Sequence, residues 1–176
     1  MLISYTAEVH ALAGVLKPWQ SIFSNSKVIS DAVTFIHLAG LLFAGGFAVA
    51  ADRSTFRALR GTSQDRATLL REVGDVHRPV LIGLTVLFGS GVLLATADVA
   101  TFGTSPVFLV KMTLVALLLL NGLALQSTEN ALRERTVSVS GAVEAEPLWQ
   151  KLRRTAMVSV ALWTSIVLAG TILVNS

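Results

Sequence analysis

The stretch "DAVTFIHLAGLLFAGGFAVAA", from Asp31 to Ala51, carries a single ionisable side chain away from its ends, the imidazole of His37. A helix needs about 20 apolar residues to cross the hydrocarbon core of a bilayer, and this stretch is long enough. Lipid offers the backbone no hydrogen-bond partners, so an open strand is excluded there. The stretch therefore predicts a transmembrane helix that holds a histidine.

The composition of the whole chain is also typical of a membrane protein. Of its 176 residues, 53% are hydrophobic and 14% are charged, and the mean hydropathy is +0.68. A soluble domain is about a quarter charged. The chain has no cysteine, which excludes disulfides, thiolate metal sites and cysteine nucleophiles. Its basic residues lie beside apolar runs, so the formal charge of +3 indicates membrane topology rather than nucleic-acid binding.

Three further stretches have the same length and apolar character. Pro79 and Pro106 begin two of them, at a helix position where the missing N–H of proline does no harm. We predict an all-α fold, a four-helix transmembrane bundle with an N-terminal amphipathic interfacial helix. The expected spans are about 31–51, 79–97, 106–126 and 155–174.

The positions of lysine and arginine predict the orientation of the bundle. The loops after the first and third spans carry eleven of them: Arg53, Arg57, Arg60, Arg66, Arg71, Arg78, Arg133, Arg135, Lys151, Arg153 and Arg154. The opposite side carries only Lys17 and Lys27. Because basic residues accumulate in cytoplasmic loops, we expect a multi-pass protein of the bacterial inner membrane with both termini outside.

The N-terminal segment, residues 1–29, differs from the bundle, residues 30–176. Its apolar residues are spaced three or four apart, which draws one stripe along a helix: Leu2, Tyr5, Val9, Leu12, Leu16, Trp19 and Phe23. Pro18 is expected to break or kink this helix near Lys17. The helix either lies on the outer leaflet or packs against its own bundle or a second protomer.

His37 is expected to point into the bundle. Gly40, Ala44 and Ala48 share its side of the helix, and a face of small residues is a packing face in membrane helices. His37 lies roughly 10 Å into the first span, and Lys111 lies at a similar depth in the third span. Ionisable groups inside a span are costly and often mark function, so these two residues are the first candidates for a site.

A b-type haem is one hypothesis for this site. His37 would supply an axial nitrogen, and Lys111 would pair with the propionates. Glycines such as Gly40 would give the macrocycle room. The second ligand would be Met112, His10, His37 of a second protomer, or none.

His77 is excluded as that second ligand. It is expected at the inner membrane edge, roughly 20 Å from His37.

Structural roles are the alternative for the same residues. His37 can be a neutral imidazole bonded to a backbone carbonyl or a polar side chain. Lys111 can snorkel and pair with Asp31 or Asp98.

The other polar or large residues of the spans have simpler interpretations. Asn121 predicts an interhelical hydrogen bond, Met112 is ordinarily core filling, and Trp163 is expected in the core. His77, beside Arg78, is expected to be solvated or near lipid phosphates. Aspartate and glutamate fall in the predicted loops and helix ends, so no buried carboxylate relay is expected.

Several motifs resemble known membrane families. "HLAGLLFAGGFAVAADRSTFR" (37–57), "SPVFLVKMTLVALLLLNGLAL" (105–125) and "VALWTSIVLAG" (160–170) resemble an uncharacterised family of small bacterial four-helix integral membrane proteins. "FGTSPVFLVK" (102–111) and the histidine before glycines are distantly similar to the copper-resistance D type membrane domain. A weaker resemblance, through His37, Arg78–Pro79 and Lys111, is to the membrane-bound protoporphyrinogen oxidase, which carries haem b. These resemblances imply redox chemistry or metal traffic.

Two functions stay open at this point. The first is a membrane redox protein that holds haem b on His37 and exchanges electrons with a membrane redox partner. The second is a non-enzymatic accessory subunit or a cation conduit, for copper among others, in which His37 and Lys111 are packing or pathway residues. Three methionines and no cysteine supply few soft ligands for Cu(I). Whether the chain is an enzyme is left open, and we expect a homo-oligomer in the lipid bilayer.

Overall fold

The computed structural model describes residues 2–136 and 145–174, with side chains for 14–135 and 145–173. The described residues form helices and no strand, which confirms the predicted all-α bundle. The helices are α1 (Leu2–Asn25), α2 (Lys27–Arg60), α3 (Ser63–Ala97), α4 (Val99–Thr104), α5 (Pro106–Thr136) and α7 (Glu146–Val174).

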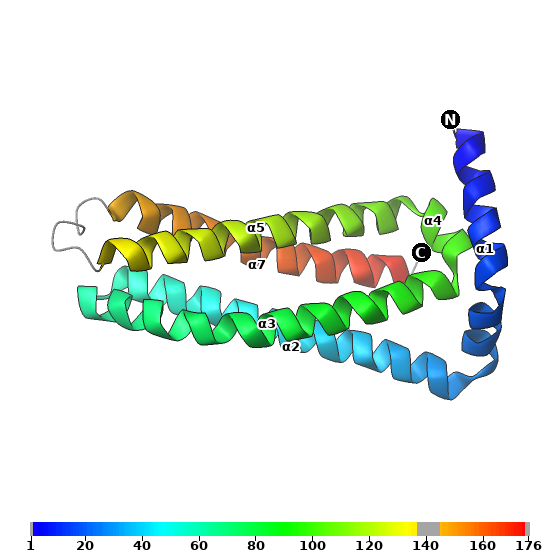
Figure 1. Cartoon of the computed structure of the whole chain (residues 1–176), viewed down its shortest axis with the longest axis horizontal. Helices are drawn as coiled ribbons and strands as arrows, with labels where there is room; N and C mark the ends of the chain where they lie inside the picture. The colour runs from blue at the N-terminus through cyan, green and yellow to red at the C-terminus, as the bar shows by residue number, and fades with distance from the viewer. Residues whose placement is uncertain (1, 137–144, 175–176) are drawn as a thin grey trace.

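The four long helices form two antiparallel hairpins, α2 with α3 and α5 with α7 (Figure 1). The hairpins meet mainly where α2 packs against α7. Helix α1 lies across one end of the bundle, which we call the α1 end (Figure 1). At the other end lie the turn between α2 and α3 and the facing ends of α5 and α7; we call this the basic end.

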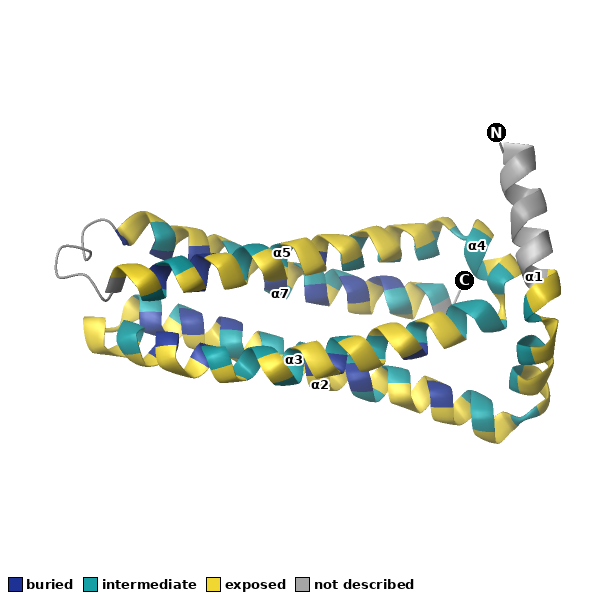
Figure 2. Cartoon of the chain, viewed as in Figure 1, coloured by how far each residue is buried: buried dark blue, intermediate teal, exposed yellow. Residues whose placement is uncertain are grey.

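The same four helices are long and apolar enough to cross a membrane. Their outward faces carry large apolar side chains, such as Phe35 at 71% exposed and Leu42 at 76% exposed, as lipid contact requires (Figure 2). The chain therefore has the architecture of a multi-pass membrane protein.

The helices extend well beyond the predicted spans at the basic end. The sequence predicts a loop after the first span, but α2 continues to Arg60 and α3 starts at Ser63. The chain turns at Gly61 and Thr62, where a capping box holds the start of α3: the Thr62 N–H donates to Asp65 Oδ2 at 2.6 Å. Charged residues thus lie on helices rather than in a loop.

Small residues allow the close approach of α2 and α3. A Cβ placed on Gly83 would lie 2.9 Å from the Ala44 Cβ, and one on Gly40 would lie 3.2 Å from the Leu87 backbone nitrogen. Side-chain packing in membranes replaces the hydrophobic drive that holds soluble bundles, so such contacts govern helix pairing. The predicted packing face of Gly40 and Ala44 is confirmed, since both are buried.

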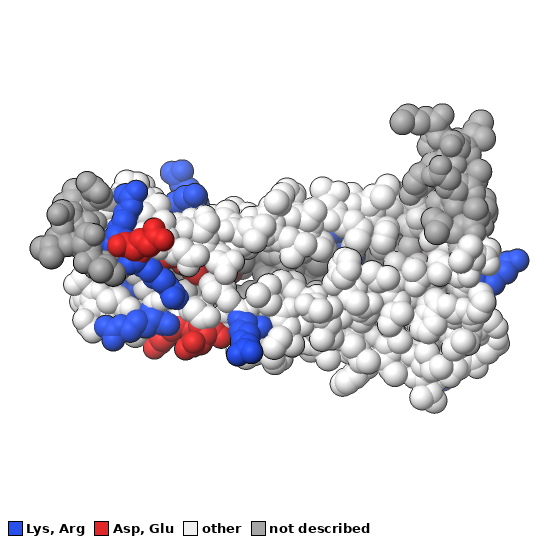
Figure 3. Space-filling model, in the orientation of Figure 1, with Lys and Arg blue, Asp and Glu red and all other residues white. Residues whose placement is uncertain are grey.

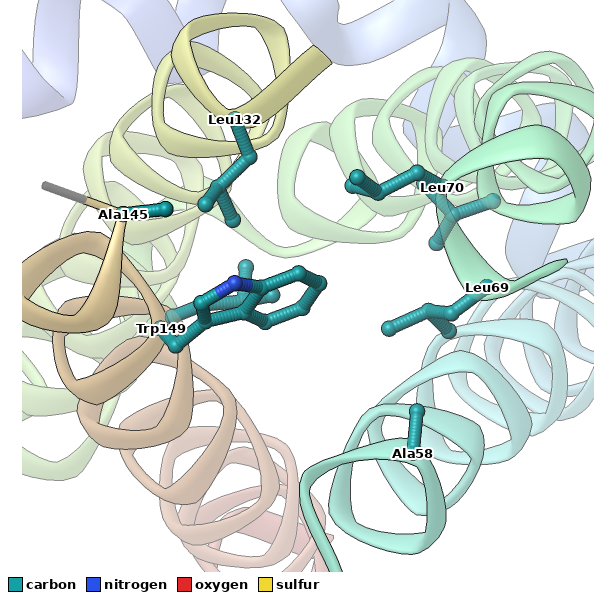
Figure 4. Close-up of a cluster of buried hydrophobic side chains, with 8 residues drawn as sticks. Ala58, Leu69, Leu70, Leu132, Ala145 and Trp149 are labelled. Atoms are coloured by element: carbon teal, nitrogen blue, oxygen red, sulfur yellow. The ribbon is translucent and has the colours of Figure 1, made fainter. Parts of the chain in front are cut away.

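Two apolar clusters fill the bundle. The cluster at the basic end contains Trp149, whose indole extends between the two hairpins toward Leu69 and Leu70 (Figure 4). The central cluster contains Ala44, Leu118, Trp163 and Ile166. Trp163 is 5% exposed and packs against Gly45, which confirms its predicted place in the core.

Helix α1 is continuous through Pro18, so the predicted break does not occur. The indole N–H of Trp19 donates to the Leu93 carbonyl at 3.1 Å, and the Gln20 amide donates to the Thr96 carbonyl at 3.4 Å. These bonds attach α1 to the end of α3, as one of the two sequence alternatives expects. A place on the membrane surface stays a prediction.

Replacement of Gly83 by alanine should destabilise the bundle. The added methyl overpacks the contact with Ala44, at a cost of about 1–3 kcal/mol that exceeds the gain in helix propensity. The matched control is Gly89→Ala on the same helix, where a Cβ meets nothing within 4 Å. In detergent, the thermal midpoint of Gly83→Ala should fall below wild type, and that of Gly89→Ala should not. Equal midpoints for the two variants would contradict the packing described above.

Candidate functional site

His37 is held by a side chain of the neighbouring helix. Its Nδ1 lies 3.1 Å from the hydroxyl of Ser90, which is buried on α3. The Ser90 hydroxyl donates its hydrogen to the Val86 carbonyl at 2.7 Å and to the Leu87 carbonyl at 3.1 Å. With that hydrogen directed to a carbonyl, the Ser90 oxygen is free to accept from Nδ1–H, in the His37 tautomer that leaves the lone pair on Nε2. The ring also packs against Gly91, where a Cβ would lie 3.2 Å from Cε1.

Lys111 shares the half of the bundle nearer α1 with His37. Its charge acts on the His37 imidazole, and its ammonium lies against Gly170 of α7, 3.7 Å from where a Cβ would be. Among the described residues, Lys111 forms no ion pair with Asp31 or Asp98, so the predicted pairing with an aspartate is wrong. Asp98 instead caps α4 by accepting from the Thr101 N–H at 3.2 Å.

The other residues named for a cofactor lie elsewhere. Gly40 faces the backbone of α3, so its missing side chain is used for helix packing. Met112 is 41% exposed on the outward side of α5. The side chain of His10 lies outside the described residues.

Towards the middle of the bundle the interior becomes apolar. The central cluster around Trp163 fills the space beyond His37 and Lys111. Asn121 donates from Nδ2 to the Thr155 carbonyl at 3.0 Å, which confirms the predicted interhelical hydrogen bond between α5 and α7.

Four polar side chains lie beyond this layer, nearer the basic end, and each comes from a different long helix. They are Asp52 of α2, His77 of α3, Glu129 of α5 and Ser159 of α7, and we call them the four-helix cluster. His77 Nε2 lies 2.7 Å from Glu129 Oε2, and the Ser159 side chain lies near the Asp52 carboxyl and acts on it. Glu129 also lies close enough to Asp52 for the two carboxylates to interact electrostatically.

In each of these two pairs, the residues come from different hairpins. Glu129 and Ser159 belong to the α5–α7 hairpin, whereas His77 and Asp52 belong to the α2–α3 hairpin. Asp52 is 3% exposed and Glu129 is 1% exposed, and one oxygen of each, Oδ2 and Oε1, has no hydrogen-bond partner. Buried carboxylates with open acceptor positions are rare because desolvation is costly, and they often mark function.

Two sequence predictions are wrong here. His77 was expected to be solvated, but it is bonded to a buried glutamate. Aspartate and glutamate are expected in loops and at helix ends, with no buried carboxylates, but the helices are longer than the apolar stretches, so Asp52 and Glu129 are inside the bundle. A signal for Asp52 was present, since it continues the four-residue spacing of Gly40, Ala44 and Ala48 along the packing face of α2.

The structure keeps His37 and His77 apart. Ser90, the partner of His37, lies thirteen residues beyond His77 on α3, which is roughly 20 Å along a helix. The two histidines therefore belong to different sites, in line with the sequence argument against a shared haem iron.

Comparisons with known proteins add no assignment. No model of a known protein family matches the chain, and no curated protein or solved structure matches it. The argument for function therefore rests on the residues of the two sites.

Removal of the His77 side chain should lower the stability of the protein, because it leaves the buried Glu129 without its partner. His77→Leu leaves the buried Glu129 carboxylate without its partner at 2.7 Å, and removing one partner of a buried pair costs about 3–5 kcal/mol. Because His77 is 29% exposed, solvent screening reduces the expected loss to about 1–3 kcal/mol.

The double variant His77→Leu/Glu129→Leu should recover more than half of this loss in a denaturant titration in detergent, since no charge is then left unpaired. The control Glu134→Leu changes an exposed glutamate of the same helix and should have little effect. A double variant as unstable as the single one would contradict the pairing.

Proposed function

We propose that this chain is a non-enzymatic membrane protein that conducts protons between the His37 site and the four-helix cluster. The observation that carries the proposal is the burial of two carboxylates, Asp52 and Glu129, within electrostatic range of each other, with His77 bonded to Glu129 and Ser159 near Asp52. Ionisable residues inside membrane proteins mark ion pathways and proton relays. The sequence left open a cation conduit as the second possible function, and we propose that the conducted cation is a proton.

The side chains present favour a proton over a metal ion. A proton needs one titratable group at a time, whereas a divalent metal needs several ligands gathered around it. In the part of the chain that the structure describes, no three His, Cys, Asp or Glu residues are grouped to hold a metal. Two buried carboxylates within electrostatic range favour the binding of a proton by one of them, because like charges in apolar surroundings repel.

The route has two polar ends and an apolar middle. At the basic end, His77 is partly exposed and links solvent to the buried Glu129, from which a proton reaches Asp52. At the α1 end, His37 offers Nε2 as the acceptor while Ser90 holds Nδ1. The central cluster around Trp163 separates these ends, so conduction requires this layer to open or admit water.

The test is proton flux into liposomes that contain the purified protein and a pH-sensitive dye. A potassium gradient with a potassium ionophore supplies the driving voltage. Wild type should acidify the lumen faster than empty liposomes, and Glu129→Gln should reduce the flux to the level of empty liposomes. Glu134→Gln makes the same change at an exposed position of α5 and should leave the flux intact. Wild-type flux equal to that of empty liposomes, or undiminished flux in Glu129→Gln, would overturn the proposal.

The membrane in question is the bacterial inner membrane, with the basic end in the cytoplasm and both termini outside. The clustering of charge supports this orientation: on the face shown in Figure 3, most charged side chains gather at the end away from α1. In this orientation the four-helix cluster exchanges protons with the cytoplasm through His77.

Single cysteines test the orientation, because the natural chain has none. Thr101→Cys lies at the α1 end and Gln64→Cys at the basic end, and both positions are exposed. A membrane-impermeant maleimide should label Thr101→Cys in intact cells and Gln64→Cys only after permeabilisation. The reverse pattern would invert the proposed orientation.

A b-type haem on His37 is the second candidate, and one observation favours it. The bond from Nδ1 to Ser90 fixes the ring and leaves Nε2 with a lone pair, as a metal-ligating histidine requires. The rest of the proposed site fits less well, because Gly40 packs against α3 and Met112 faces outward. Bound haem would supply one-electron transfer with a membrane redox partner.

A visible spectrum decides on haem. Protein purified in detergent from haem-replete cells should be colourless if proton conduction is the whole function. A Soret band that is present in wild type and absent in His37→Ala would establish the haem candidate instead. Ser90→Ala serves as the companion variant, since it frees the ring and should shift such a band.

A further inference from the structure

A groove of about 300 Å³ opens at the basic end, between α7 and the turn that joins α2 to α3. It is lined by Leu59, Arg66, Glu146, Trp149, Gln150, Arg153, Arg154 and Met157. It lies outside both sites described above. We propose that this groove binds the anionic headgroup of a phospholipid, so that the chain holds a specific lipid at the inner leaflet.

The groove has an excess of positive charge in a fixed arrangement. Arg66 is held in place, because its Nη1 lies 3.1 Å from Glu146 Oε2 and its guanidinium lies 5.1 Å from the centre of the Trp149 ring. Arg153 and Arg154 are exposed and form no ion pair with any described residue. Three arginines against one glutamate leave two positive charges for a ligand. Guanidinium groups match phosphate oxygens in pairs, which suits a phosphate headgroup.

The depth of the groove favours a lipid over a free anion. Arg153 and Arg154 come directly before the apolar stretch that begins at Thr155, which places them at the height of lipid phosphates. The groove ends at Met157, which is 47% exposed.

Further exposed apolar side chains follow on the same helix, including Leu168 at 60% exposed. A headgroup at the arginines would thus have its acyl chains against α7. A soluble phosphate would use only the basic part of the groove.

The proposal also explains the position of Trp149. Its indole is 4% exposed in the cluster at the basic end (Figure 4). The guanidinium of Arg66 lies over the same ring. Tryptophan at this height is common in membrane interfaces. The indole therefore links the apolar core to the charged groove and keeps Arg66 directed along it.

Lipid binding can be measured on the intact protein in detergent by native mass spectrometry. Phosphatidylglycerol and phosphatidylcholine with identical acyl chains are offered at equal concentration. Wild type should retain phosphatidylglycerol in clear preference. Each arginine near an anionic headgroup strengthens binding about fivefold, so Arg153→Gln/Arg154→Gln should lower the preference by about tenfold or more. Gln150→Lys adds a cation to the groove and should raise it.

The control Arg60→Gln/Arg71→Gln removes the same charge from exposed positions of the basic end that do not line the groove. It should keep the preference. An equal loss in this control would show diffuse attraction and overturn the groove as the site. Full competition by millimolar inorganic phosphate would assign the site to a free anion and overturn the lipid. If Arg153→Gln/Arg154→Gln leaves the preference for phosphatidylglycerol unchanged and Gln150→Lys does not raise it, neither the groove as the site nor the lipid as its ligand would stand.

Discussion

A charged side chain in the apolar interior of a bundle needs a partner from another helix, and this constraint sets how the two hairpins lie together. His77 bonds to Glu129, and Ser159 lies near Asp52, so each pair brings together residues of the two hairpins. Breaking such a contact leaves a buried carboxylate uncompensated, which is far more costly than losing an exposed ion pair. The relative position of the two hairpins therefore depends on which side chains form the four-helix cluster.

Within each hairpin the contacts have another character. Small residues bring α2 and α3 together at Gly83 and Ala44, and Asn121 ties α5 to α7. Such pairs are stable units in lipid, where van der Waals packing replaces the hydrophobic effect. The chain thus combines two apolar hairpins with a polar junction, and a change of proton occupancy at the junction would act on how the hairpins meet.

The sequence was sufficient for the fold because apolar length and charge placement dominate in lipid. The spans, the packing face of α2, the core position of Trp163 and the bond of Asn121 all follow from those rules. The four-helix cluster did not follow, since the apolar runs end before Asp52 and Glu129 although the helices continue. Ends of apolar runs are not ends of helices, so polar residues beyond them, here Asp52 and Glu129, can lie inside the bundle. The partner of His37 could not be predicted from the sequence either. Ser90 is one of several hydroxyl residues on α3, and only the register between α2 and α3 brings it to His37.

Proton binding by the buried carboxylates is the central claim, and infrared difference spectroscopy during a pH titration tests it most directly. A protonated carboxyl has a carbonyl stretch that a carboxylate lacks, and this band shifts on exchange into D₂O. The account predicts such a band in wild type, its loss in Asp52→Asn or Glu129→Gln, and its persistence in Glu134→Gln. A wild-type spectrum without the band, or a band that survives both Asp52→Asn and Glu129→Gln, would contradict the account.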